Sequence, residues 1–186
     1  MTDATFPARG LAGRLAAIPS GSIGMLTNKA KYGLRAMCAL AQAQGVRLQA
    51  HAIASQASVP EKFLEAILVE LRKAGFIDSR RGQRGGHALA RPASDITVGD
   101  LIRAIDGPLA PVRCASMSAY APCTDCVDPQ RCAVRALMRE TRSAVCGVLD
   151  RCSLQTLSDQ SRLEHPRLES PPAHARGIDI RQGLLP

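Results

Sequence analysis

The chain has 186 residues and a formal net charge of +8, and only 3% of its residues are aromatic. This length favours a single domain, and an apolar content made mostly of Ala, Leu, Ile and Val favours helices packed on helices. No apolar run is long enough to span a membrane, and no secretory signal pattern is visible. We therefore expect a cytoplasmic protein whose cysteines bind metal or react as thiols rather than form structural disulfides.

The two ends of the chain show no sustained periodicity. Residues 1–24 are rich in Gly, Pro and Ser, so we expect a disordered extension, unless Met25 is the true start. Residues 158–186 contain four prolines and predict a disordered tail.

Between these ends, the first elements are helical. Apolar residues at helical spacing predict a helix over 28–42 that ends before Gly45, and a short helix follows over 49–57. Ser58 and Glu61 have the spacing of a capping box, which predicts the start of a third helix that runs to Ala74. That helix should bury Leu64, Ile67, Leu68 and Leu71 and should expose its basic and acidic residues.

A basic, glycine-rich segment comes next. Residues 76–90 predict two short strands around a turn, and Thr97 is expected to cap a helix that runs to about Asp106. Two helices joined by a short turn and followed by a basic hairpin define a winged helix-turn-helix. We therefore assign residues 25–108 to a mainly α, winged helix-turn-helix DNA-binding domain.

Within this domain, the third helix should enter the major groove and the wing should meet phosphate or the minor groove. Residues 72–91 carry six Lys or Arg against one acid, although a basic face used for protein contacts is the alternative. The candidate DNA-binding residues are Thr27, Lys29, Tyr32, Lys62, Glu65, Arg81 and Arg84. For the three residues of the first helix, capping, solvation and packing are equally compatible with the pattern. Glu65 could accept from a cytosine amino group, or could simply face solvent.

Four of the seven cysteines fall within nineteen residues, in an expected loop over 109–133. Cys114, Cys123, Cys126 and Cys132 are separated by eight, two and five residues. Crowded thiolates on a polar, proline-containing segment are typical ligands of zinc and of iron–sulfur clusters, and the spacing leaves both open. Four unrelated thiols are the alternative. A thiol-redox or iron–sulfur electron-transfer enzyme is conceivable, but no catalytic motif supports it, so we expect no enzyme.

A long helix over 129–157 is predicted to follow. Its apolar residues recur in a near-heptad stripe, which is typical of a dimerisation helix. The stripe consists of Val134, Leu137, Thr141, Val145, Val148 and Cys152. Because helix-turn-helix proteins commonly read two-fold sites as dimers, we expect a homodimer on a pseudo-palindromic double-stranded DNA operator. The alternative is that this helix folds back on its own domain.

Five segments resemble the bacterial IscR/NsrR/RirA-type regulators: 25–35, 63–68, 71–75, 81–86 and 96–100. The resemblance extends from Met25 to about Leu157. It implies a homodimeric winged-helix transcription factor that binds a 2Fe–2S or 4Fe–4S cluster through three cysteines of this loop. The recognition-helix glutamate of that family matches Glu65, and its wing arginine matches Arg81.

The chain also departs from that family. The last cysteine interval matches Cys126 and Cys132, which leaves Cys114 as the first ligand and Cys123 as an extra cysteine. The histidine ligand of IscR is Arg135 here, and the aspartate ligand of NsrR is Lys31. We hypothesise that Cys123 supplies the fourth ligand. The expected function is cluster-controlled operator binding, with a zinc-stabilised or cluster-free regulator as the alternative.

Overall fold

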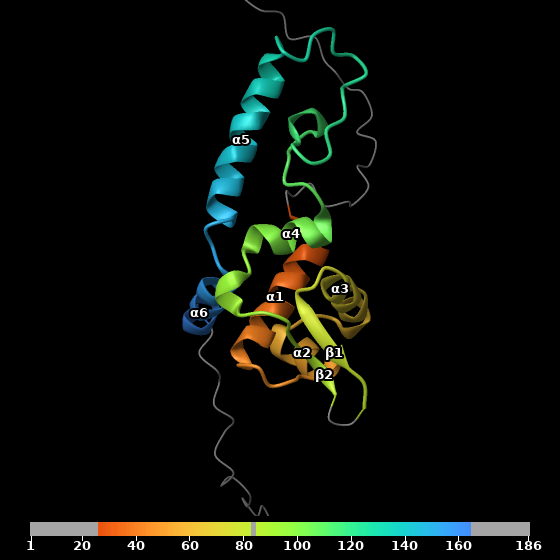
Figure 1. Ribbon diagram of the computed structural model, residues 1–186, viewed down its shortest axis with the longest axis vertical. Coiled ribbons are helices and arrows are strands. Elements are labelled where there is room, and N and C mark those ends of the chain that lie inside the picture. The colour runs from red at the N-terminus through yellow and green to blue at the C-terminus, as the bar shows by residue number, and fades with distance from the viewer. Residues whose placement is uncertain (1–25, 83–84, 165–186) are drawn as a thin grey trace, which may run out of the picture.

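A computed structural model describes residues 26–82 and 85–164, so the expectations for residues 1–24 and for most of the tail lie outside the described residues. A helical body lies at one end, and a single long helix and the cysteine loop extend from it (Figure 1). The fold is mainly helical with a two-stranded wing, which confirms the predicted winged helix-turn-helix class. The elements are α1 (Asn28–Gln42), α2 (Ala50–Ala57), α3 (Glu61–Lys73), β1 (Ile77–Arg80), β2 (Gly86–Leu89), α4 (Val98–Asp106), α5 (Ala133–Leu149) and α6 (Leu154–Glu164), with short 3-10 turns at Ala93–Asp95 and Arg113–Ala115.

The core is built around α1, which lies between α6 on one side and α3 on the other (Figure 1). Met37 and Leu40 of α1 are almost fully buried, and they belong to the same cluster as Leu64 and Leu71 of α3. Gly33 lets α4 cross α1 closely, because a Cβ at that position would lie 2.3 Å from Cδ1 of Ile105. The four residues predicted to form the inner face of α3 are all buried.

The turn between α2 and α3 corrects one prediction. Ser58 does not cap α3. It lies in the left-handed region with φ 50° and closes α2, and its neighbour Val59 donates its backbone N–H to the Ala54 carbonyl at 3.0 Å. Pro60 occupies the N-cap of α3 and no side chain caps that helix. The predicted capping box is wrong because the same serine is needed to end the preceding helix.

The wing is an antiparallel hairpin whose register runs from Ile77 opposite Leu89 to Arg80 opposite Gly86. Leu48, in the connection before α2, extends it by pairing with His87 through two backbone hydrogen bonds of 2.9 and 2.8 Å. Gly86 has φ 123°, and a Cβ there would lie 2.6 Å from the Leu48 carbonyl oxygen. Glycine is therefore required where the wing meets the helix-turn-helix body.

The predicted single helix over 129–157 is also wrong. α5 begins at Ala133 and ends at Leu149, and after a short connection the chain enters α6. The connection is bonded to the segment before α4: Val98 donates to the Cys152 carbonyl at 2.9 Å, and Leu154 donates to the Ile96 carbonyl at 2.8 Å. These contacts turn the chain back onto α1, so Cys152 lies in the connection rather than on one continuous stripe.

The start of the predicted disordered tail is helical as well. Leu154 is fully buried and Ser158 is 2% exposed, so residues 158–164 continue α6 against the body, and the rest of the tail lies outside the described residues. Among the described residues, none of the helices is long and apolar enough to cross a membrane.

Candidate functional site

The outer face of α3 carries the residues predicted to read DNA. Lys62 and Glu65 are exposed on its first turns, opposite the buried leucines that fix the helix on the body. α3 follows α2 after a short turn and lies next to the wing (Figure 1). This geometry leaves the first turns of α3 exposed beside the wing, as a recognition helix requires.

An aromatic pair lies beside these residues: Tyr32 is half-buried, and Phe63, which the sequence analysis did not single out, is exposed. Phe63 is 48% exposed, and its ring stacks on Tyr32 of α1 with 6.2 Å between centroids. Lys62 lies 4.8 Å from the centroid of the Phe63 ring, and Lys31 lies 5.5 Å from that of Tyr32. Tyr32 is thus a packing partner at the edge of the basic surface. Phe63 directly follows Lys62 in the sequence and lies outside the four positions predicted to be buried, so its position could have indicated this pair.

The other two candidates in α1 are bound to acidic side chains. The Thr27 hydroxyl accepts from the Ala30 N–H at 3.2 Å, so Thr27 caps α1, and its own N–H and hydroxyl donate to the Asp106 carboxylate. The Lys29 ammonium lies 2.7 Å from the Glu70 carboxylate of α3. Both residues therefore connect α1 to neighbouring helices at the edge of the candidate surface.

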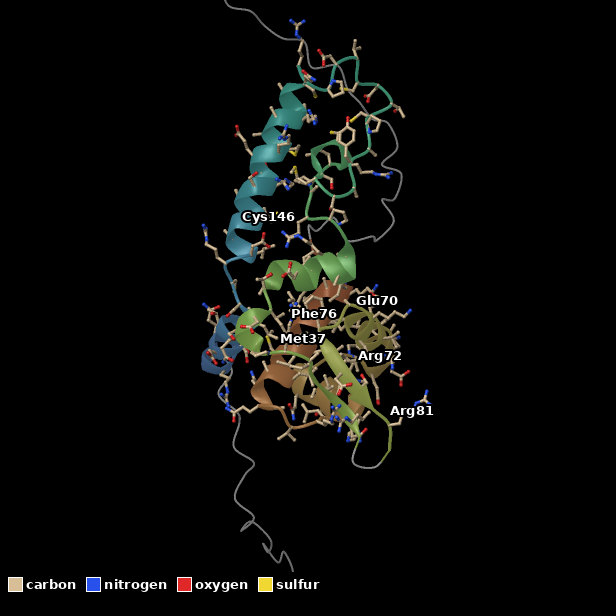
Figure 2. All side chains as sticks on the ribbon, in the orientation of Figure 1. Met37, Glu70, Arg72, Phe76, Arg81 and Cys146 are labelled. Carbon is tan, nitrogen blue, oxygen red and sulfur yellow. The ribbon has the colours of Figure 1, made fainter. Side chains whose placement is uncertain are left out.

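The wing carries positive charge without a competing acid at its tip. Asp78 is its single acidic residue, and Arg47 pairs with that carboxylate and also donates to the Gly86 carbonyl at 3.3 Å. Arg47 lowers the pKa of Asp78 below its ordinary value, so this carboxylate is ionised at neutral pH. Arg81 is exposed near the turn of the hairpin and lies away from the body (Figure 2). Arg84 lies outside the described residues.

The cysteine loop joins α4 to α5. Cys114 is buried at 7% exposure in the short turn Arg113–Ala115, whereas Cys123 is exposed and Cys126 and Cys132 are partly buried. The Cys114 side chain raises the pKa of Cys123, and partial desolvation followed by Cys132 raises that of Cys126. Smaller contributions come from Cys126 to the pKa of Cys123 and from Cys114 to that of Cys126. Within the described residues, no three Cys, His, Asp or Glu side chains are grouped closely enough to hold a metal ion.

Arg135, which replaces the histidine expected from the family resemblance, organises this loop. Its guanidinium donates to the Cys114 carbonyl at 2.9 Å and to the Pro129 carbonyl at 3.1 Å, and it lies 5.6 Å from the centroid of the Tyr120 ring. Its backbone N–H donates to the Cys132 sulfur at 3.4 Å, which makes Cys132 the N-cap of α5.

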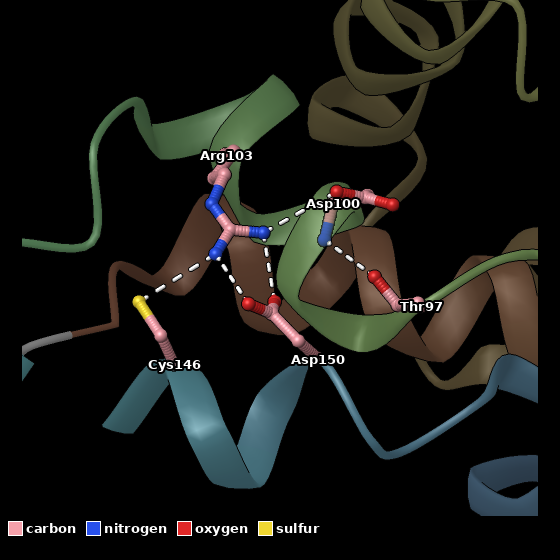
Figure 3. A network of polar contacts seen from close by, with 5 residues as sticks. All are labelled: Thr97, Asp100, Arg103, Cys146 and Asp150. Atoms are coloured by element: carbon pink, nitrogen blue, oxygen red, sulfur yellow. Dashed lines mark hydrogen bonds and ion pairs between the residues drawn. The ribbon is translucent and has the colours of Figure 1, made fainter. Parts of the chain in front are cut away.

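The far end of α5 is fastened to α4 by a contact we call the α4–α5 joint, formed by Gly99, Arg103, Cys146 and Asp150. Arg103 donates to both carboxylate oxygens of Asp150, at 2.8 and 2.9 Å, and to the Cys146 sulfur at 3.5 Å (Figure 3). The pKa of Asp150 is lowered by this guanidinium. Gly99 makes the approach possible, since a Cβ there would lie 1.9 Å from Oδ1 of Asp150.

Between its two ends, α5 has an uncovered apolar surface. It has no buried residue, and Val134, Leu137 and Val148 of the predicted stripe are each about 60% exposed, at 63, 58 and 63%. In Figure 1 this helix extends away from the helical body.

A recognition helix with an exposed polar face, a basic wing and a projecting helix together define a winged helix-turn-helix transcription regulator. Comparison with known proteins gives the family: residues 26–160 match the model of the Rrf2 family, described as iron-dependent transcriptional regulators, and the chain belongs to this family. The family consists of transcription regulators rather than enzymes, and its regulatory function entails binding to DNA. The resemblance to IscR-type regulators is thereby confirmed.

Individual relatives agree with this assignment. An rrf2-like helix-turn-helix regulator of Rhodobacter capsulatus is 40% identical over 137 residues, which cover 72% of this chain and 91% of the relative. CymR, the global cysteine regulator of B. subtilis, has a solved structure with a TM-score of 0.59 and 34% identity, covering 73% of this chain and 96% of CymR. The structure of T. potens IscR has a TM-score of 0.58 and 28% identity, covering 75% of this chain and 89% of that one.

Proposed function

We propose that the chain is a cytoplasmic, homodimeric regulator whose operator binding is controlled by an iron–sulfur cluster in the cysteine loop. The observation that carries this proposal is the position of four thiols within nineteen residues, between the DNA-binding body and the projecting helix α5. A ligand bound at this place acts on the connection between the part that reads DNA and the part that presents an uncovered apolar stripe.

In this proposal, Glu65 and Lys62 of α3 read base edges, and Arg81 and Arg84 of the wing bind the backbone or the minor groove. Thr27, Lys29 and Tyr32 lie at the edge of this surface, where Thr27 and Lys29 contribute mainly by holding α1. Since phosphate contacts release counterions, operator affinity is expected to fall steeply with salt.

The donor set fits a thiophilic group. Cys114, Cys123, Cys126 and Cys132 would hold it, since crowded cysteine side chains are typical ligands of zinc and of iron–sulfur clusters. A 2Fe–2S or 4Fe–4S cluster supplies a centre whose charge changes on oxidation, nitrosylation or loss. Arg135 positions the loop by fastening the Cys114 carbonyl and the N-terminus of α5.

The exposed side of α5 supports the proposed dimerisation. Three large apolar side chains on a helix with no buried residue favour pairing with a second copy of that helix. Two recognition helices related by a two-fold axis would then meet two half-sites of a pseudo-palindromic operator.

The α4–α5 joint gives a physical route from loop to DNA. A change in the loop shifts α5, and the bidentate Arg103–Asp150 pair carries that shift to α4, which crosses α1 at Gly33. The distance between the two recognition helices changes, and with it the fit to the half-sites. A coupling of about 1–3 kcal/mol is the usual range for such effects.

A regulator with zinc or no metal in the loop is the second candidate. Two observations favour it. Within the described residues no three loop thiols are grouped closely enough to hold a metal ion, and the chain is similar over 73% of its length to CymR, a global cysteine regulator. In that case the loop acts as a structural staple or as a thiol sensor.

Cysteine-to-alanine variants separate these candidates and test the fourth ligand. We expect Cys123→Ala and Cys126→Ala each to lower the iron and sulfide content of anaerobically purified protein. Cys152→Ala, which removes a cysteine outside the loop, serves as the matched control and should retain the full content. If Cys123→Ala leaves cluster content and stability unchanged, the fourth-ligand hypothesis is wrong.

A further inference from the structure

A cavity separate from the cysteine loop lies between α1, α6 and the end of α2. Its volume is about 810 Å³, which is within the usual range for small-molecule sites. Residues of one face of α1, including Leu34, Cys38 and Gln42, form one wall, and Leu157 and Ser161 of α6 form the opposite wall. In Figure 1, α6 lies on the other side of α1 from α3 and the wing, so the cavity lies mostly away from the candidate DNA-binding surface, whose edge it meets at Lys31.

The charged residues around the cavity all have the same sign. Among the described residues, Lys31 and Arg35 of α1 and Arg162 of α6 line it, and no Asp or Glu does. None of these three cations forms an ion pair within the described residues, in contrast to Lys29, Arg47 and Arg103. Positive side chains that converge on one recess raise the local concentration of anions and lower the free energy of a bound negative charge.

Nearby negative groups do not cancel this charge. The Cys38 thiol is part of the lining, and burial followed by the proximity of Cys152 raises its pKa to about 11, so it is neutral at pH 7. Asp159, on the same turn of α6 as Leu157, is not among the residues that line the cavity, and its carboxylate accepts hydrogen bonds from Gln155 at 3.0 and 3.1 Å. The carbonyls of Ala54 and Ser55 near the end of α2 are occupied by the N–H groups of Val59 and Ser58.

The rest of the lining is suited to an organic body with a polar edge. Leu34, Ala39 and Leu157 give an apolar wall, while Gln56 and Ser58 provide side chains that can donate hydrogen bonds. We infer that this cavity binds a small organic anion, a short aliphatic carboxylate or phosphate ester, with its charged group between the three cations. The inference does not depend on the cysteine loop.

Such a ligand would also touch an element that positions the recognition helix. Ser58 lines the cavity and begins the turn between α2 and α3, and α6 follows directly from the α4–α5 joint. A ligand that contacts both α6 and this turn would couple to DNA binding, and by linkage DNA would change the affinity for the ligand by the same factor.

Calorimetric titration of the purified full-length chain, at constant ionic strength, tests the inference with three probes whose aliphatic chains are of similar length. We expect saturable binding of hexanoate or hexyl phosphate and at least tenfold weaker binding of the uncharged hexanamide, because hexanamide lacks the charge-assisted contacts. The double variant Arg35→Gln/Arg162→Gln should weaken anion binding by at least about tenfold. Lys73→Gln, which removes an exposed positive charge from α3 outside the cavity, should bind the anion as the unmodified chain does.

Three results would overturn the inference. The first is the absence of saturable anion binding, and the second is equal binding of hexanoate and hexanamide. The third is that Arg35→Gln/Arg162→Gln binds the anion normally but binds a random DNA duplex more weakly, with a smaller dependence of DNA affinity on salt (a slope lower by about two). The two arginines would then be phosphate contacts. The measured quantity is the heat of anion binding, which does not involve the cysteine loop. A negative result would therefore leave the cluster proposal unaffected, and a failure of the cluster proposal would leave this inference unaffected.

Discussion

Gly99 is the residue through which the α4–α5 joint can be tested most directly. Its substitution by alanine places a Cβ 1.9 Å from Oδ1 of Asp150 and 3.0 Å from Nη1 of Arg103. The arginine end can move aside, but the carboxylate is held by two hydrogen bonds of 2.8 and 2.9 Å. Gly99→Ala should therefore force the joint apart.

The magnitude follows from two opposing effects. Overpacking of this kind costs about 1–3 kcal/mol, and replacing glycine by alanine within a helix returns about 0.5–1 kcal/mol. In an Asp150→Ala background the obstructing carboxylate is gone, so only the second effect remains and Gly99→Ala should become neutral or stabilising. The coupling free energy between the two substitutions is then about 1–3 kcal/mol.

Urea unfolding of the four proteins of this double-mutant cycle, at one fixed protein concentration, measures that coupling. Gly147→Ala in α5 is the matched control. A Cβ there would meet its nearest described neighbour, Nη2 of Arg151, only at 3.9 Å, so this change should stabilise the fold slightly. Equal costs of Gly99→Ala in the presence and absence of the Asp150 carboxylate would refute the reasoning.

Three further predictions concern the dimer, the DNA surface and pH. Leu137 is 58% exposed, so its burial in two symmetric copies contributes about 2–3.5 kcal/mol to dimerisation. Leu137→Asp should therefore raise the dimer dissociation constant, measured by analytical ultracentrifugation, at least about 30-fold, whereas Arg139→Asp on the opposite side of α5 should leave it unchanged. Equal dissociation constants for the two variants would exclude this interface. In competition assays, Glu65→Ala should reduce the difference in binding free energy between operator and random DNA by about 1–3 kcal/mol. Arg81→Ala should weaken binding to operator and to random DNA alike and reduce the salt slope by about one. If each variant lost the same affinity for the two kinds of DNA, the division into base and phosphate contacts would be wrong. Arg103 lowers the folded-state pKa of Asp150, so the ion pair stabilises the fold at pH values above the unfolded-state pKa of about 4, and this contribution is lost as the pH falls through the lowered folded-state pKa. The difference in unfolding free energy between the unmodified chain and Asp150→Asn should therefore be present at pH 7 and shrink in acid. A difference that does not change with pH would contradict this prediction.

The elements of the DNA-binding body could be predicted because local patterns and caps agree with the tertiary structure. The helix predicted over 28–42 begins at the expected residue, and Thr27 and Thr97 accept the capping hydrogen bonds. Gly75 has φ 76°, which fits the end of α3.

Elements set by long-range contacts could not be predicted. No Gly or Pro marks the end of α5; the chain turns at Asp150 because Arg103 and the segment around Thr97 hold it there. The spacing of Ser58 and Glu61 matched a capping box, yet the left-handed end of α2 required the serine elsewhere. In the cysteine loop, the spacing of the cysteines indicates a set of soft metal ligands. Because the backbone of the loop is irregular, the distances between these side chains cannot be calculated from their spacing in the sequence. The three contacts of the Arg135 side chain likewise depend on how the loop folds.

The central claim is that a cluster in the cysteine loop controls operator binding, and one experiment addresses both halves of it. Anaerobically purified protein is assayed for iron, sulfide and zinc, and its affinity for duplexes selected from a random library is measured before and after the metal is removed. We predict iron and sulfide in matching amounts, broad visible absorbance, and an affinity change of about 5–150-fold on removal. Zinc without colour, or an affinity that is the same with and without the cluster, would contradict the account.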